Sequence, residues 1–243
     1  MNDSGAAVWG PEVLTLRDKV CFLPDVAARL GSTVWGLATY CGGKRGRPLS
    51  PEVDVDPPET VWTTNAEVRS LEVLGHEFYA HSLRTWCFGL ALAQIDGAEL
   101  DRELFYVAAL LHDIGLRKPI SDRCFTVAGA EAAESLAPTD TPLRDVERVR
   151  SAILAHIDIR TPADPLAHYL QAGSLLDVAG SRISEVDPRF LRQTCQQWIR
   201  VGFPGTCRSL WRGECRRFPH GRAAYARCPG GLLLGVRLNA LPR

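Results

Sequence analysis

The feature that most constrains the fold is a long stretch in which apolar side chains recur at helical spacing. Between about Thr63 and Trp198, apolar residues return every three or four positions, and the alternation typical of strands is scarce. The pattern predicts an all-α helical bundle. Helices are expected over 78–95, 101–115, 127–136, 142–157, 166–180 and 188–200, with an earlier one over 23–30.

The chain on either side of this stretch has a different composition. Glycine and proline gather between Gly42 and Pro58, which indicates a linker or long loop. We therefore expect an irregular N-terminal extension and linker over 1–59, a helical domain over 60–203 and an arginine-rich tail over 204–243. In the tail, 223–227 and 232–238 predict a short β-hairpin that turns at 229–231.

Charge is distributed unevenly although the net charge is zero. Residues 188–243 contain eleven arginines, no lysine and one acid, Glu214, for a net charge of +10, so the first 187 residues carry −10. This basic segment could face an anion or an acidic partner, or it could pack on the acidic body of the same chain.

Several classes of protein are not supported by the sequence. No apolar run approaches the ~18–20 residues that span a bilayer, and the first residues show no secretory signal, so we expect a cytoplasmic protein without a membrane. The eight cysteines form no C-x-x-C pair and are expected to be reduced thiols. The sequence has no G-x-S-x-G, P-loop or G-x-G-x-x-G motif. One R-G-R-P segment, 45–48, resembles an AT-hook core, but we do not expect nucleic acid as a partner.

Titratable side chains lie on the apolar faces of four predicted helices. They are His81, the His112–Asp113 pair, His156 and Asp177. A buried titratable group costs free energy unless it has a partner. A lone histidine in such a place is usually a hydrogen-bonded core residue, but two imidazoles and two carboxylates together would suit zinc, iron or manganese.

The order of these residues resembles the HD-domain superfamily of metal-dependent hydrolases. The segments HSLRTWCFG at 81–89, LFYVAALLHDIGL at 104–116 and GSLLDVAG at 173–180 resemble the cyanamide hydratase-like branch of that superfamily. FTVAGA at 125–130 and AILAH at 152–156 resemble further segments of the branch, and the likeness extends over about 60–203.

The resemblance implies an enzyme with one divalent metal, zinc or iron with manganese as an alternative. It implies that the metal is held by His81, His112, Asp113 and Asp177, and that a water activated by the metal attacks a small molecule. His156, Arg84 and Lys118 are the candidates for substrate binding or proton transfer.

Two alternatives to a hydratase-like enzyme remain open. One is an HD phosphohydrolase of a nucleotide or other phosphate ester, although Leu116 stands where many such enzymes have lysine. The other is a regulatory or binding protein that keeps the fold without activity. Thr126 also favours this alternative, because the resemblance predicts an acidic residue at that position. The expected partner is a small-molecule substrate, and a homo-oligomer stays open.

Overall fold

The structure is a computed structural model that describes residues 12–43, 46, 49, 52–227 and 232–242. All the regular elements in these residues are helices, and the only β interaction among them is an isolated antiparallel bridge between Val13 and Gly221. The helices are α1 (Leu16–Cys21), α2 (Leu23–Cys41), α3 (Val61–Asp96), α4 (Arg102–Leu111), α5 (Ile114–Arg117), α6 (Phe125–Leu136), α7 (Leu143–Ala155), α8 (Pro165–Ala179), α9 (Pro188–Gln197), α10 (Phe203–Arg217), α11 (Arg222–Arg227) and α12 (Leu232–Leu238).

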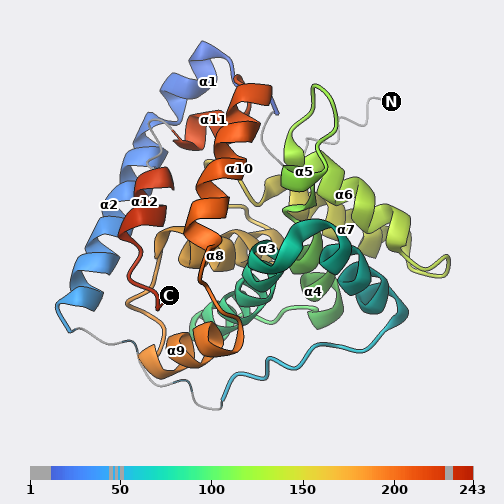
Figure 1. The fold of residues 1–243 in the computed structure, drawn as a ribbon, viewed down its shortest axis with the longest axis horizontal. Helices are drawn as coiled ribbons and strands as arrows, with labels where there is room; N and C mark the ends of the chain where they lie inside the picture. Colours follow the sequence, from blue (N-terminus) through green and yellow to red (C-terminus); the bar gives the residue numbers. More distant parts are fainter. Residues whose placement is uncertain (1–11, 44–45, 47–48, 50–51, 228–231, 243) are drawn as a thin grey trace.

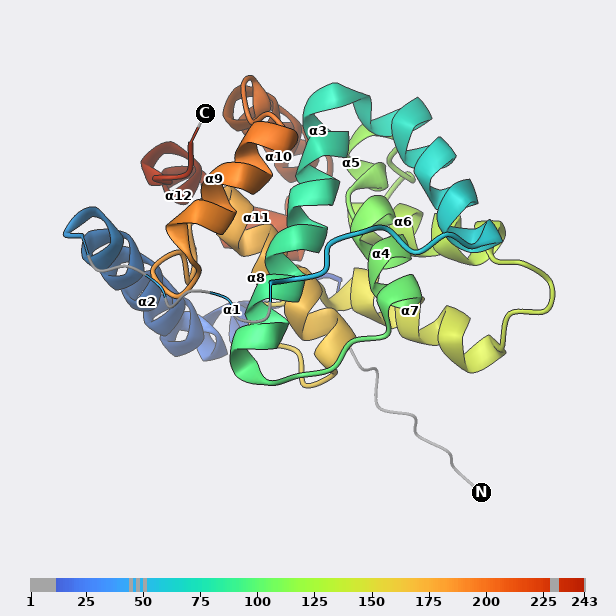
Figure 2. The same cartoon turned by 90° about the horizontal axis from the view of Figure 1, so that it is seen from below.

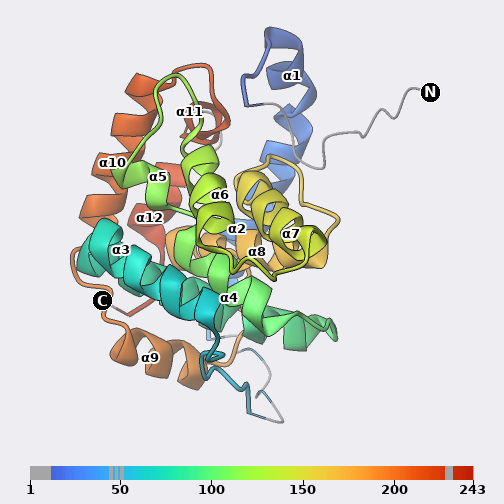
Figure 3. The same ribbon diagram turned by 90° about the vertical axis from the view of Figure 1, so that its right-hand side faces the viewer.

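Helix α8 lies at the centre of the bundle (Figures 1, 2 and 3). It packs against α3, α4 and α7 on one side and against α12 on the other. Asp164 caps its first turn by accepting a hydrogen bond from the backbone N–H of Ala167, and Gly180 ends it in the left-handed conformation. The expected all-α bundle is therefore confirmed.

Helix α3 is longer than the 78–95 helix expected from the sequence, and it is kinked. Thr60 caps its first turn, and Gly75 interrupts the helical backbone with φ 69° and ψ 168°. A positive φ favours glycine, because any side chain would be strained there. The kink separates an N-terminal half, in which Ser70 donates to the carbonyl of Leu110 in α4, from a C-terminal half that carries His81 and Arg84 into the core.

The single helix expected over 101–115 is in fact two helices. Helix α4 ends at Leu111 and α5 begins at Ile114, so His112 and Asp113 lie at the break between them. Asp101 caps α4, with its carboxylate accepting a hydrogen bond from the N–H of Leu104. The break matters for the site, because it turns two adjacent side chains toward the same point.

A close approach of backbones fixes α3 against α8. A Cβ added to Gly173 would meet the carbonyl oxygen of Thr85 and lie 2.8 Å from the nitrogen of Gly89. Glycine at 89 and 173 therefore lets the two helices touch. This contact brings Asp177 of α8 beside His81 and Arg84 of α3.

The flanks of the chain are more regular than the sequence predicts. The expected hairpin over 223–227 and 232–238 is wrong, because these residues form α11 and α12, and the residues of its turn lie outside the described part. In the extension, α2 begins where the helix over 23–30 was expected but continues to Cys41, and α1 forms where irregular chain was expected. Of the R-G-R-P segment, only Gly46 is described. Among the described helices, none is long and apolar enough to cross a membrane.

Candidate metal centre

Two of the candidate histidines end helices in the same way. His112 is the C-cap of α4 and His156 is the C-cap of α7. Each Nδ1 lies within hydrogen-bonding distance of the carbonyl oxygen three residues earlier, at 2.8 Å for His112 to Ala109 and 2.6 Å for His156 to Ile153. A carbonyl only accepts, so each Nδ1 carries the proton, and each Nε2 keeps a lone pair free for a cation or a proton.

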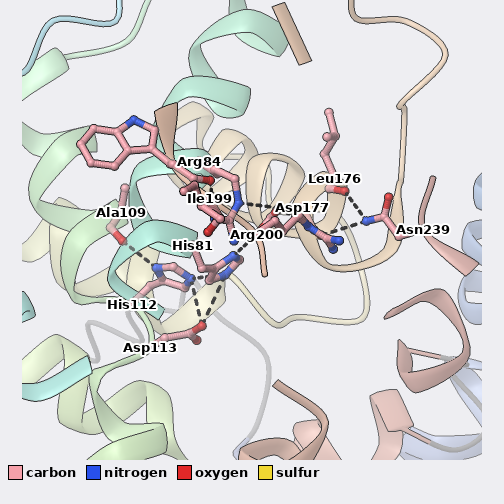
Figure 4. Close-up of polar contacts among 11 residues, drawn as sticks. His81, Arg84, Ala109, His112, Asp113, Leu176, Asp177, Ile199, Arg200 and Asn239 are labelled. Carbon is pink, nitrogen blue, oxygen red and sulfur yellow. Dashed lines mark hydrogen bonds and ion pairs between the residues drawn. The ribbon is translucent and has the colours of Figure 1, made fainter. Parts of the chain in front are cut away.

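His81 reaches the same arrangement through a carboxylate. Its Nδ1 lies 2.6 Å from Oδ2 of Asp177, which fixes the ring and leaves Nε2 unprotonated (Figure 4). Phe203 stacks on the ring, with centroids 4.7 Å apart and planes inclined by 17°. The imidazole is fully buried, so its orientation is set by these two neighbours.

Asp177 is held by two buried arginines. Arg84 donates from Nε and from a terminal nitrogen to its two oxygens, each at 2.9 Å, and Arg200 donates to Oδ1 at 2.9 Å. Arg84 also donates to the carbonyls of Trp198 and Ile199. These contacts join α3, α8 and the segment before α10 around a single carboxylate.

Three ligand atoms converge at one point (Figure 4). Nε2 of His81 and Nε2 of His112 are 3.4 Å apart, and they lie 3.5 and 3.3 Å from Oδ2 of Asp113. Tetrahedral ligands about 2.0–2.1 Å from zinc are themselves about 3.3 Å apart. The donor set and its spacing therefore fit one divalent cation, and His81, His112 and Asp113 are the group that could hold a metal among the described residues.

Burial and neighbouring charges shift the pKa of each group in this cluster. Burial lowers the pKa of His81, although Asp177 opposes it. Burial also opposes the charge on Asp113, but His112 and His156 outweigh it and hold the pKa of this carboxyl well below its usual range. Burial likewise disfavours ionised Asp177, yet Arg84 and Arg200 hold its pKa well below the usual range. For His112, burial is outweighed by Asp113, and its pKa is raised.

The sequence-predicted residues divide into three groups in the structure. His81, His112 and Asp113 meet, and His156 lies beside them with Nε2 3.7 Å from Oδ1 of Asp113. Asp177 and Arg84 lie behind His81, with Asp177 on the Nδ1 side of the ring, and ligation by Asp177 stays a prediction. Lys118 is exposed at the end of α5 and does not line the cavity described below, so its role also stays a prediction.

Sequence reasoning missed two residues that support the site. They are Arg200, which is 1% exposed and bonded to Asp177, and Phe203, which stacks on His81. Arg200 is the last residue of the helix expected over 188–200 and Phe203 follows that helix, in a part of the sequence that indicated only a basic composition. No local signal could have found them, because their partners are fixed only by the packing of α10.

A cavity of about 110 Å³ reaches the site. Asp113 and His156 lie in its wall beside Phe78 and Phe203, and the rest of the wall comes mainly from α2, α8, α10 and α12. The buried cluster is thus open on one side to a space that a small ligand could occupy.

The fold and the site together define a helical protein with a buried histidine–aspartate cluster that could hold a metal ion. Residues 78–179 match the family model of the HD domain. The match includes all four ligands expected from the sequence. No curated protein matched the chain.

Proposed function

We propose that the protein is a metal-dependent hydrolase or hydratase that acts on a small molecule. The observation that carries this proposal is the near-equilateral triangle of two Nε2 atoms and one carboxylate oxygen at the wall of a cavity. A divalent cation bound there would lower the pKa of a coordinated water to about 7, which supplies a nucleophile at neutral pH.

The chain's own residues have distinct tasks in this reaction. His81, His112 and Asp113 hold the cation, and Asp177 with Arg84 and Arg200 orients His81. His156 faces the cavity with an unprotonated Nε2, and burial lowers its pKa. It is therefore placed to accept a proton from the attacking water or to bind the substrate.

The cyanamide hydratase-like reaction is the finer form of this proposal. In it, water adds across the carbon–nitrogen triple bond of a small nitrile and gives an amide without a leaving group. The segments 81–89 and 104–116 support it, and Leu116 in place of lysine favours it over a phosphohydrolase.

The test is metal analysis of purified protein followed by assays on cyanamide, small nitriles and nucleotide mono- and diesters. We expect His112→Ala and Asp113→Ala to lose the metal and turnover while the far-UV helical signal is largely kept. Turnover of phosphate esters but not of nitriles would replace the hydratase with a phosphohydrolase, and full activity in either variant would contradict the metal centre.

A further inference from the structure

The cavity at the metal centre is almost entirely apolar, and helices outside the HD domain match form much of its wall. Six residues of α2 line it at positions 26, 29, 30, 33, 34 and 37, which is one continuous helix face. Helix α12 contributes Leu232, Leu234, Gly235 and Leu238. Both helices lie outside residues 78–179, so this chain's own flanks shape the space in front of the part that matches the family model.

The rim of the cavity is apolar as well. Val34, Leu234 and Leu238 line it and are 58%, 55% and 56% exposed. The cavity therefore reaches the surface between α2 and α12, which lie near each other in Figure 1. Leaving large apolar side chains in water at one place is typical of a site that takes up apolar ligands.

The wall of the cavity contains few charged side chains, and its arginine already has hydrogen-bond partners within the protein. Arg29 is the only cationic residue lining the cavity among the described residues, and it donates to the carbonyl of Asp158 and to the side chain of Gln171, each at 3.2 Å. Recognition of a phosphate usually takes several free arginines, lysines or backbone N–H groups.

Size leads to the same conclusion. The volume of about 110 Å³ is of the order of the ~150 Å³ apolar cavity that holds benzene. It is well below the ~300–1,000 Å³ of pockets that bind drug-sized ligands. The enclosed volume therefore favours a small apolar molecule over a nucleotide.

We infer that the substrate is a small, uncharged, predominantly apolar molecule, whose hydrocarbon part lies between α2, α8 and α12 and whose reactive polar group faces Asp113 and His156. This substrate class rests on the proposed function, but the binding preference of the cavity does not. The apolar face of α2 is then the element that selects the substrate.

Straight-chain primary alcohols from ethanol to hexanol test the cavity without requiring any reaction. Calorimetry on the metal-loaded protein should show the dissociation constant falling about fourfold per added methylene until the cavity is full. Adenosine monophosphate and phenyl phosphate should bind more weakly than hexanol. A dissociation constant that does not change with chain length, or tighter binding of either phosphate, would overturn the inference.

Leu30 lines the cavity, and Ala28 on the same helix is exposed and does not. Leu30→Trp should weaken hexanol binding at least tenfold, whereas Ala28→Trp should leave it unchanged, and both should keep the metal. If Leu30→Trp does not fold, Leu30→Ala serves in its place. It enlarges the cavity, so the alcohol that binds most tightly should have a longer chain than in the unchanged protein. Unchanged binding in the Leu30 variants would contradict the inference. Alcohol binding without turnover of any nitrile or ester would count against the proposed function alone.

Discussion

At the scale of single residues, the site depends on which nitrogen of each imidazole carries the proton. Three histidines use Nδ1 to donate, two to helix-terminal carbonyls and His81 to Asp177. The free carbonyls at a helix end are ready acceptors. Position at a helix end thus prepares two of the Nε2 atoms for a cation without any special sequence.

Asp177→Asn tests the support of His81. The amide cannot accept from His81 and from both arginines at once, so the imidazole loses its fixed tautomer. We expect metal affinity to fall about 10–100-fold, as for other partners behind a metal ligand. Metal titration by calorimetry measures this.

Asp96→Asn is the matched control for Asp177→Asn, because Asp96 bonds to Arg182 and Tyr169 away from the metal group. It should leave metal affinity unchanged. Complete loss of metal in Asp177→Asn, equal to that in Asp113→Ala, would show instead that Asp177 is a direct ligand, and unchanged affinity would contradict both roles.

At the scale of helices, the α3–α8 contact sets the distance between His81 and Asp177. Gly173→Ala places a Cβ against the backbone of Thr85 and Gly89, so α8 and α3 must move apart. We expect a loss of about 1–3 kcal/mol in the free energy of unfolding and weaker metal binding.

Gly213→Ala in α10 is the control, because nothing lies within 4 Å of its Cβ. Its free energy of unfolding should rise by up to about 1 kcal/mol. Equal effects of the two substitutions in urea unfolding would contradict the contact.

The ion pair between the end of α3 and the loop after α8 makes stability depend on pH. Arg182 donates to both oxygens of Asp96, at 2.9 and 2.7 Å, and lowers the pKa of Asp96. A carboxyl whose pKa is lowered by folding stabilises the protein above its unfolded pKa of about 3.9 and loses that contribution as the pH falls. Asp96→Asn should therefore cost about 1 kcal/mol at pH 7, and the difference should shrink below about pH 4. Urea unfolding of both proteins at several pH values measures this. A difference in the free energy of unfolding that increased as the pH fell would contradict the role of the ion pair.

The helices show what the sequence could and could not predict. Those with a clear 3.6-residue period were found, and so were His81, His112 and Asp113, because polar groups on apolar faces are visible in a sequence. Helix α12 was mistaken for a strand, because a short apolar run such as Leu232–Leu238 has no decisive period and packing on α8 decides its conformation. Arg200 was missed because its partner, Asp177, is determined by the fold.

At the scale of the whole molecule, the flanks and the HD domain share one core. Leu37 of α2, Trp211 of α10 and Val236 of α12 belong to the same buried cluster as Phe88 and Leu170. Part of the basic segment packs on the acidic body, since Arg200 bonds to Asp177 and Arg222 to Asp158, both buried arginines. These two bonds support the explanation that the basic segment packs on the acidic body of the same chain.

A shared core predicts cooperative unfolding. We expect a single transition in urea, with coincident midpoints for far-UV circular dichroism and tryptophan fluorescence. The tryptophans report on both parts, because Trp86 lies in α3 and Trp211 in α10. Separate transitions would show that the flanks fold independently of the HD domain, and the walls of the cavity would then be less firmly fixed than the structure indicates.

The most direct measurement of the central claim is the position of a metal in crystals of the protein, from anomalous scattering at the edges of zinc, iron and manganese. We expect one peak about 2.0–2.2 Å from Nε2 of His81, Nε2 of His112 and Oδ2 of Asp113. A peak bound elsewhere, or an ordered triangle of ligands without any metal in protein prepared with these ions, would contradict it.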